Sequence, residues 1–270
     1  MCYTYANERM RIICQIAPLN MQCTWPSSAQ CQKIFKAIQY TNTTVNISLD
    51  DRGMHIMTMD SSKTSLVRLE LKTSFFEQWS CAVPLTLGIH TETLSAALQK
   101  AKGARVSWRA QNDTTLEILF DKDRRTTSFA LRSIDIEDDA LDIPEMVDDV
   151  GLFTSDTVIK EWMDTVLMAK GDVAFQVSPR ELTCSASTIE FGDIAVKEPM
   201  QDGNIRVHNF KEDVDITLSF HAAKSFATFA ACGKACFMGF SNQMPSRLKI
   251  NLDDTNSYIA LYVAPKIVDE

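Results

Sequence analysis

The sequence predicts an α+β protein built from two similar domains, each mostly antiparallel sheet with two helices on one face. Three observations carry this prediction. The two halves of the chain repeat each other at an offset of about 130 residues. Short segments of alternating apolar and polar residues, separated by turn residues, fill most of both halves. Four segments instead place apolar residues at helical spacing. At 270 residues the chain is long enough for two ordinary domains.

The duplication is seen in three pairs of segments that match in order. In the first pair, two alternating strands flank a turn, which indicates a hairpin in each half. In the second pair, a short strand leads into a helix. The third pair is a strand near the end of each half. The matching segments are 45–56 with 173–184, 86–90 with 217–221, and 129–132 with 259–262.

Each half carries two predicted helices. Ser27–Ser28, Thr91 and Ser155 are expected to cap the first three, because their hydroxyls can accept from free backbone N–H groups. The fourth is expected over about 222–231, with Phe226 and Phe229 inward. The inward stripes of the first three helices comprise Cys31, Ile34, Phe35 and Ile38; Leu94, Ala97, Leu98 and Ala101; and Val158, Ile159, Trp162, Met163, Val166 and Leu167.

An acidic connector separates the two halves. From Ile134 to Asp149 the chain holds eight acidic residues, no basic one, and Pro144, which no helix interior accommodates. This segment is predicted to be exposed. Its eight acidic residues account for the net charge of −8, so positive and negative charges are nearly equal in the rest of the chain. The predicted divisions are an N-terminal extension at 1–20, a first domain at 21–133, the connector at 134–150 and a second domain at 151–270.

Composition and motifs argue against several functional classes. No stretch approaches 18 uninterrupted apolar residues, so no membrane span is expected. The eight cysteines include no CxxC pair, and His221, Cys232 and Cys236 are too few for a convincing metal site. We expect reduced, mostly buried thiols of an intracellular protein. No nucleotide-binding loop, nucleophile motif or metalloprotease motif occurs, so we expect no enzymatic activity, no metal and no cofactor.

Three further segments carry a family resemblance. They are 49–67, centred on Met59-Asp-Ser-Ser; 141–145 (Leu-Asp-Ile-Pro-Glu) within the connector; and the C-terminal 261–270, with Ala264-Pro-Lys-Ile followed by acids. Together they resemble the proliferating cell nuclear antigen (PCNA) family of DNA sliding clamps, collinearly from about Met21 to the end. The resemblance implies a homotrimeric ring of head-to-tail subunits, with helices lining a hole for duplex DNA. It implies a processivity factor for DNA polymerase in replication and repair, opened by a clamp loader.

The resemblance also implies a basic helix face that follows DNA phosphates without reading sequence. Lys33 and Lys36 lie opposite the first apolar stripe, as expected for such a face. The third helix is a poor match, because Glu161 and Asp164 share its polar side. The candidate DNA-binding residues are Lys33, Lys36, Lys100, Lys102, Arg105, Lys160, Lys170, Lys224 and Lys234.

Clients of this family dock a short peptide whose aromatic and aliphatic plug fills a pocket beneath the connector. Some matching positions in this chain would serve equally as core. Leu141 and Ile143 are apolar residues in an acidic loop, and are therefore the strongest candidates. The full set is Met59, Lys63, Leu66, Leu141, Ile143, Pro144, Met244, Pro245, Tyr262, Val263, Ala264, Pro265 and Lys266.

Ring closure in the family pairs an edge strand of one subunit with an edge strand of the next. The resembling strands are 125–132, with Phe129 and Leu131 as apolar anchors, and about 189–197, with Ile189 and Ile194.

Two departures from the family pattern stand out. Residues 1–20 have no family counterpart. The turn Ser178-Pro179-Arg180 lies where cellular members carry a lysine that receives ubiquitin. The missing lysine suits a divergent or virus-encoded clamp, acting in the nucleus or at a cytoplasmic replication site. The alternatives are a subunit of a hetero-oligomeric, checkpoint-type clamp, a monomeric processivity factor, and a nuclease or polymerase accessory enzyme.

Overall fold

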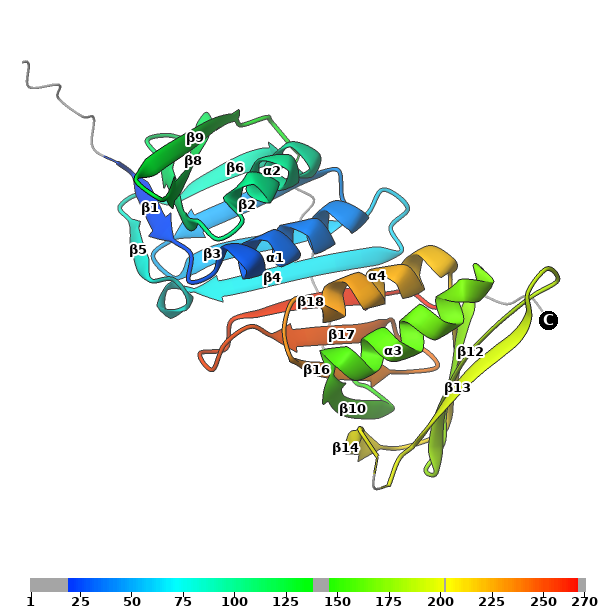
Figure 1. Ribbon diagram of the computed structural model, residues 1–270. Helices are drawn as coiled ribbons and strands as arrows, with labels where there is room; N and C mark the ends of the chain where they lie inside the picture. The colour runs from blue at the N-terminus through cyan, green and yellow to red at the C-terminus, as the bar shows by residue number, and fades with distance from the viewer. Residues whose placement is uncertain (1–18, 138–145, 202, 267–270) are drawn as a thin grey trace, which may run out of the picture.

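A computed structural model describes residues 19–137, 146–201 and 203–266 (Figure 1). Strands form a curved layer behind the helices, and all four α-helices lie across the face of that layer turned toward the viewer. Within the described ranges no helix is long and apolar enough to cross a membrane.

The helices and strands follow one order in both halves. The first half contains β1 (Met21–Thr24), α1 (Ser28–Thr41), β2 (Thr44–Asp50), β3 (Gly53–Met59), β4 (Ser65–Lys72), η1 (Thr73–Phe75), β5 (Gln78–Cys81), β6 (Leu85–His90), α2 (Thr91–Leu98), η2 (Gln99–Ala101), β7 (Arg105–Ala110), β8 (Thr115–Lys122) and β9 (Arg125–Arg132). The second contains β10 (Val150–Ser155), α3 (Asp156–Val166), η3 (Leu167–Ala169), β11 (Val173–Val177), β12 (Glu181–Thr188), β13 (Gly192–Pro199), β14 (Arg206–Phe210), β15 (Val214–Leu218), α4 (Phe220–Ala230), β16 (Ala235–Phe240), β17 (Ser246–Asn251) and β18 (Tyr258–Val263).

This order confirms the predicted α+β class and the internal duplication. Each half places one helix after its first strand and a second after its sixth. The strands form three antiparallel sheets, in the orders β5-β1-β7-β8-β9, β14-β10-β16-β17-β18-β4-β3-β2-β6 and β13-β12-β11-β15. The long middle sheet exists because β18 of the second half pairs with β4 of the first. A single pair of strands therefore joins the two halves into one continuous sheet.

The helix starts agree with the sequence in two of three cases. Ser27 caps α1 and Ser155 caps α3, each accepting a hydrogen bond from a backbone N–H three residues on. The prediction for Thr91 is wrong, because His90 is the N-cap of α2 and Thr91 is its first helical residue. The Thr91 hydroxyl instead donates to the carbonyl of Asn42 at 2.6 Å. A buried hydroxyl facing a free carbonyl forms that bond in preference to a cap.

The fourth helix begins earlier than expected. It spans Phe220–Ala230, and Ser219 caps it by accepting from the N–H of Ala222. The segment 217–221 was expected to end in a strand, whereas its residues Ser219 and Phe220 are the N-cap and the first residue of the helix.

Aromatic side chains fill the space between helices and sheet in both halves. Trp25, Phe35 and Trp108 form one fully buried cluster, with ring centroids 5.2–5.9 Å apart. In the second half, Phe175 packs against Phe226 of α4 and Phe240 of β16. Such large rings account for much of the apolar area removed from water.

The chain following the last strand of each half covers an edge of a neighbouring strand. The N–H of Ile134 donates to the carbonyl of Gly88 on β6, and the N–H of Lys266 donates to Thr217 on β15. The approach at β6 needs glycine, since a Cβ at Gly88 would lie 2.0 Å from the oxygen of Ile134. These two segments close edges that would otherwise present unpaired backbone groups.

The joint between the halves should be sensitive to its buried side chains. Leu69 on β4 pairs with Ile259 on β18, and both are fully buried. Leu69→Ala should lower the free energy of unfolding by about 2–5 kcal/mol, since it leaves a cavity in the joint. Met57→Ala removes a side chain from the neighbouring strand β3 that is 39% exposed, and is the matched control with a change below about 1 kcal/mol. Urea denaturation of both variants tests this, and equal losses would contradict it.

Candidate functional site

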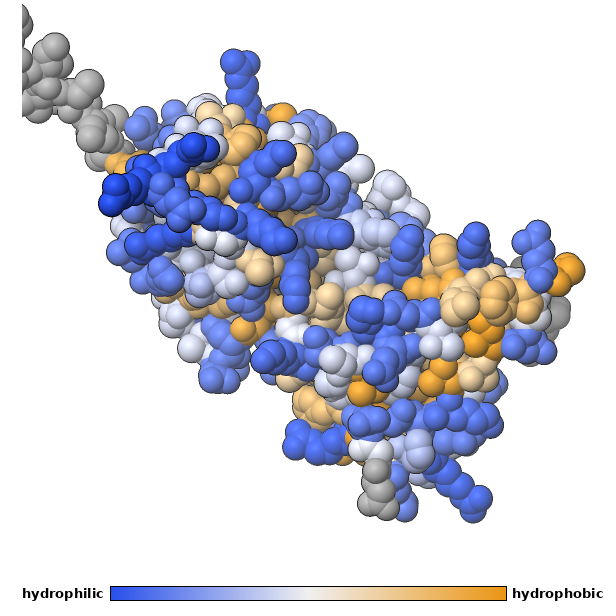
Figure 2. All heavy atoms as spheres, in the orientation of Figure 1, coloured by the Kyte–Doolittle hydropathy of each residue, from blue (hydrophilic) through white to orange (hydrophobic). Residues whose placement is uncertain are grey.

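The nine candidate DNA-binding residues are all exposed, and four of them stand on α-helices. Lys33 and Lys36 extend from α1 on the side away from its buried stripe of Cys31, Ile34, Phe35 and Ile38. Helix α1 contains no acidic residue, and the same is true of α4. Figure 2 shows hydrophilic residues spread over this helix face of the molecule. The helix face is thus cationic mainly at α1.

Helix α3 departs from this pattern, as the sequence indicated. Lys160 forms an ion pair with Asp164 one turn later, and Asp156 and Glu161 add further negative charge. Arg105 is likewise paired, with Glu77 at 3.2 Å. Both cations are therefore partly neutralised within the chain.

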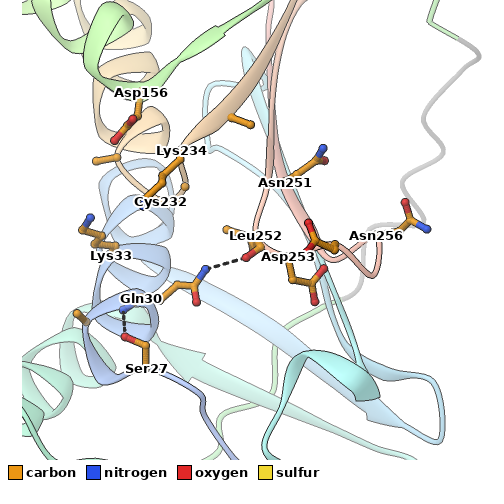
Figure 3. A pocket seen from close by; sticks show the side chains of 15 residues that line it. Ser27, Gln30, Lys33, Asp156, Cys232, Lys234, Asn251, Leu252, Asp253 and Asn256 are labelled. Atoms are coloured by element: carbon orange, nitrogen blue, oxygen red, sulfur yellow. Dashed lines mark hydrogen bonds between the residues drawn. The ribbon is translucent and has the colours of Figure 1, made fainter.

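Lys33 and Lys234 come from different halves of the chain and line one cavity of about 670 Å³ (Figure 3). The side-chain amide of Gln30 crosses between the halves and donates to the carbonyl of Leu252 at 3.2 Å. Asp156, Asp253 and Asp254 also line the cavity. Lys33 and Lys234 therefore lie close together but face mixed charge, which fits a cleft bordering a basic surface better than an anion pocket.

A cluster at the other end of α1 was missed from the sequence. Tyr40 stacks on His221 of α4 with centroids 4.8 Å apart, and the ammonium of Lys224 lies 5.7 Å from the Tyr40 ring. The two sides of the stack are far apart in sequence, so no local signal could have found it. His90 and His221 are the last residues of the matching segments 86–90 and 217–221, but His90 is the N-cap of α2 whereas His221 is the second residue of α4.

Four strands bring several candidate peptide-binding residues into one row. Met59 on β3 is opposite Leu66 on β4, Leu66 is opposite Tyr262 on β18, and Tyr262 is opposite Arg247 on β17. We call these four residues the docking row. Directly opposed residues in a sheet project from the same face. The intervening residues Val67 and Leu261 are fully buried toward the helices, so the docking row lies on the face away from them.

The remaining candidates border this row or fall outside it. Lys63 is in the β3–β4 turn with a positive φ of 57°, and the carboxylate of Asp60 accepts from the backbone of Thr64 and Ser65 in that turn. Val263 is only 1% exposed and belongs to the core instead of this surface, because it alternates with Tyr262. Ala264 and Lys266 are exposed, whereas Met244, Pro245 and Pro265 are half-buried. Leu141, Ile143 and Pro144 lie outside the described residues.

The described end of the connector is not simply exposed. Asp148 is 9% exposed and forms an ion pair with Arg247. It lies against Gly239, where a Cβ would be 2.1 Å from its Oδ1. Burial raises the pKa of Asp148, although Arg247 opposes this effect. One of the connector's acids is therefore a structural partner of the docking row.

Two strands expected at a subunit boundary are free sheet edges. β9 is the outer strand of the five-stranded sheet and β13 the outer strand of the four-stranded sheet. Phe129 and Ile194 are half-buried on them, and Leu131 is 9% exposed. The prediction that Ile189 belongs to the strand is wrong. It lies in the β12–β13 turn, where it is fully exposed at 106%.

Exposed apolar side chains gather near this edge. Phe191 follows Ile189 in the same turn and is 50% exposed, and Met168 in η3 is 59% exposed. Figure 2 shows hydrophobic residues at this end of the molecule. A contiguous apolar patch beside a free strand edge is typical of an interface.

His55 bridges two carboxylates on the outer face of the middle sheet. Its Nδ1 is 2.6 Å from Glu70 and its Nε2 is 3.2 Å from Asp50. The hydrogen bond with Glu70 raises the pKa of His55 above its ordinary value of 6.5. Although burial works the other way, hydrogen bonds from Arg52 and His55 hold the pKa of Asp50 at about 2. This network ties the β2–β3 hairpin to β4, and it resembles no catalytic arrangement.

Among residues 19–137, 146–201 and 203–266, no three or more His, Cys, Asp or Glu side chains gather as metal ligands. The six described cysteines are all free thiols.

Comparison with known proteins agrees with this geometry. Residues 22–140 match the family described as "Proliferating cell nuclear antigen, N-terminal domain". Over this range the chain is similar to the PCNA family. A solved structure of the family member from Entamoeba histolytica superposes with a TM-score of 0.83 at 20% identity, covering 93% of this chain and 100% of that one.

Curated relatives match most of the chain. The "DNA polymerase sliding clamp" of Methanobrevibacter smithii is 25% identical over 233 residues, which is 86% of this chain and 92% of that protein. The "Probable DNA polymerase sliding clamp 2" of Paramecium bursaria Chlorella virus 1 is 22% identical over 244 residues, or 88% of each chain. Cellular and viral relatives thus match this chain over most of their own length.

The His55 bridge predicts a pH dependence of stability. Because the folded pKa of His55 is raised, its contribution is fully present below the unfolded value of 6.5 and is lost as pH rises through the folded pKa. Wild type should therefore lose stability as pH rises above about 6.5, and His55→Gln should lose less over that window. Urea midpoints measured between pH 6 and 9 test this. Parallel curves for the two proteins would contradict the assignment.

Proposed function

We propose that this chain is a DNA sliding clamp, a non-enzymatic processivity factor for DNA polymerase that closes as a homotrimer around duplex DNA. A clamp loader opens the ring, and replication and repair enzymes dock through a short peptide on the docking row. The names of the relatives and the match of the first half to the family model support the clamp function. The nucleus, or a cytoplasmic site of viral replication, is the proposed location.

The observation that carries the proposal is that β9 and β13 each have one edge without a partner strand among the described residues. Within the chain, β18 pairs with β4. The duplication makes β9 the counterpart of β18, and β13 the counterpart of β4. Both counterparts are free edges. If β9 of one copy pairs with β13 of the next as β18 pairs with β4, the subunits join head to tail and every such edge is closed in a ring.

The internal joint also predicts the register between subunits. Equivalent hairpin pairings make Thr126 the counterpart of Tyr258, and Lys197 the counterpart of Glu70. Because Tyr258 is opposite Glu70, Thr126 should be opposite Lys197 of the next subunit. One step along, the register places Arg125 opposite Glu198. Three steps the other way, it places Phe129 opposite Ile194.

This register corrects one part of the sequence comparison. Phe129 is the counterpart of Leu261, two residues beyond the Ile259 that sequence matching had paired with it. The difference arises because the β17–β18 turn is longer than the β8–β9 turn. The predicted contact of Phe129 with Ile194 then mirrors the buried internal contact of Leu261 with Val67.

Charge reversal tests the ring and its register together. Arg125→Glu should weaken assembly, since it places two carboxylates opposite each other, and adding Glu198→Arg should restore it. Light scattering across a range of concentrations would report a mass about three times 30.3 kDa for wild type and the double variant. Arg124→Glu changes a neighbouring turn residue by the same charge and is the control.

A wild-type mass of 30.3 kDa at all concentrations would defeat the homotrimer. The remaining candidate functions would then be a subunit of a hetero-oligomeric clamp and a monomeric processivity factor.

The helix face supports the DNA part of the proposal. In a closed ring of this fold the helices line the hole, and Lys33 and Lys36 on α1 are free of acidic neighbours on their own helix. Lysine at such positions attracts the phosphate backbone without reading bases. The ion pair of Lys160 makes α3 a smaller contributor. We therefore assign DNA contact mainly to the first domain.

Salt dependence separates the two sets of lysines. Replacing Lys33 and Lys36 together with alanine should weaken DNA binding and reduce the slope of log K against log salt by about 2, since each phosphate contact contributes about 0.9. Lys160→Ala is the matched control, because its charge is already engaged by Asp164. Fluorescence anisotropy with duplex DNA at several salt concentrations measures both. A larger loss for Lys160→Ala would contradict the assignment to α1.

The docking row supports the peptide part. Met59, Leu66 and Tyr262 offer apolar surface on the face away from DNA, next to the turn that carries Lys63. An aromatic and aliphatic plug is the occupant such a surface fits.

A further inference from the structure

A second row of side chains lies beside the docking row, two residues further along each strand. Six neighbouring strands contribute one residue each to it, and these comprise three basic residues, two phenylalanines and one alanine. We call it the basic stripe; it comprises Arg68 on β4, Ala260 on β18, Lys249 on β17, Phe237 on β16, Phe153 on β10 and Arg206 on β14. Two residues of strand span about 7 Å, so the stripe and the docking row are adjacent.

Like charges are held close together at the centre of this surface. Burial lowers the pKa of Lys249, and the positive charges of Arg247 in the docking row and of Arg68 lower it further. No acidic side chain pairs with Lys249 in the described part of the chain; its ammonium instead lies 4.3 Å from the ring of Tyr258. A partly buried cation beside two others is stabilised by an added anion.

Aromatic rings fix the other cations in place. The guanidinium of Arg247 lies 5.0 Å from the Phe237 ring, and that of Arg206 lies 4.9 Å from the Phe153 ring. The buried Nε of Arg247 has no hydrogen-bond partner. Stacked guanidinium groups keep their N–H edges available to an anion.

The chain itself shows which anion fits this surface. Arg68 binds the carboxylate of Glu70 through two nitrogens, both at 3.0 Å, and Arg247 binds the carboxylate of Asp148. Carboxylates therefore already occupy the rims of the stripe, whereas Lys249 at its centre and Arg206 at its far end remain open.

We propose that the basic stripe binds acidic residues that flank the apolar plug of a client's docking peptide. The inference rests on the proposed docking function and deepens it by naming the chemistry of the flank. The stripe faces away from the helices, so the duplex DNA of the central hole does not reach it. A peptide seated on Met59, Leu66 and Tyr262 places residues two to four positions from its plug over Arg68 and Lys249, since both rows project from the same sheet face.

Binding of three synthetic peptides to the full chain tests the proposal. One carries an aromatic and aliphatic plug with neutral flanks, the second carries the same plug with an Asp-Glu-Glu flank, and the third has that flank with alanines in place of the plug. By calorimetry in low salt, the acidic flank should tighten binding about tenfold, and the gain should shrink in 0.5 M salt.

Variants of Lys249 test whether the basic stripe produces the gain in affinity that comes from the acidic flank. Lys249→Met keeps much of the stem and removes the charge, so it should abolish most of the gain while leaving the neutral plug peptide unaffected. Lys249→Arg should retain the gain. Lys122→Ala, which removes an exposed lysine at the end of β8 on another sheet, is the matched control and should change neither affinity. Thermal unfolding of each variant reports whether it is folded.

The outcomes separate this inference from the function on which it rests. If neither plug peptide binds, the docking function fails. If both bind equally, or if Lys249→Met leaves the gain intact, docking stands and the inference is overturned. Tight binding of duplex DNA that Lys249→Met weakens as much as it weakens the acidic peptide would also overturn it, because the stripe would then be a general polyanion site.

Discussion

The pairing of β18 with β4 is the interaction on which the rest of the structure depends. Among the strands that end a sheet within their own half are β4 and β9 in the first half and β13 and β18 in the second. Backbone groups on an unpaired strand must find partners or remain in water. Inside the chain this requirement is met for β4 and β18 by the six residue pairs from Tyr258–Glu70 to Val263–Ser65. It is left unmet at β9 and β13, so the duplication that builds the subunit also creates the surfaces by which copies can join.

The same joint determines where charge and apolar surface lie. Because the sheet is continuous across both halves, all four helices cover one face and the outer face stays open. Apolar residues on α1 must point to the sheet, and Lys33 and Lys36 therefore point away from it. On the outer face, alternation along β4, β17 and β18 leaves a mixture of apolar, aromatic and basic residues in neighbouring rows. A chain with a net charge of −8 thus presents basic groups on both faces.

Sequence reasoning reached the fold because duplication and periodicity are repeated signals. Three weak matches at nearly one offset are stronger evidence together than any one of them alone. The four apolar residues predicted to face inward on α1 are all buried. The predictions fail where a single residue determines the local structure. Thr91 carries a capping side chain, but a buried carbonyl of Asn42 competes for its hydroxyl. Ile189 has strand propensity, yet it occupies a turn because Thr188 and Gly192 close the hairpin. The match of Phe129 was displaced by two residues because turn lengths differ between halves.

The sites were harder to predict because they depend on pairing between distant strands. Met59, Leu66 and Tyr262 were recognised through family resemblance, and only the register shows that they share a row with Arg247. Arg68, Lys249 and Arg206 had no motif to mark them, and in sequence each reads as an ordinary strand residue. Their grouping follows from six strands aligned in one sheet, in the order β14, β10, β16, β17, β18 and, across the joint, β4.

A surface of this kind can change its chemistry by single substitutions while the fold stays the same, because the outward positions take no part in the core. The docking row, in contrast, includes Leu66, which is 9% exposed, and is therefore tied to the core beneath it. In the proposed docking function, plug recognition therefore belongs to the more constrained row, and discrimination among clients belongs to the stripe beside it.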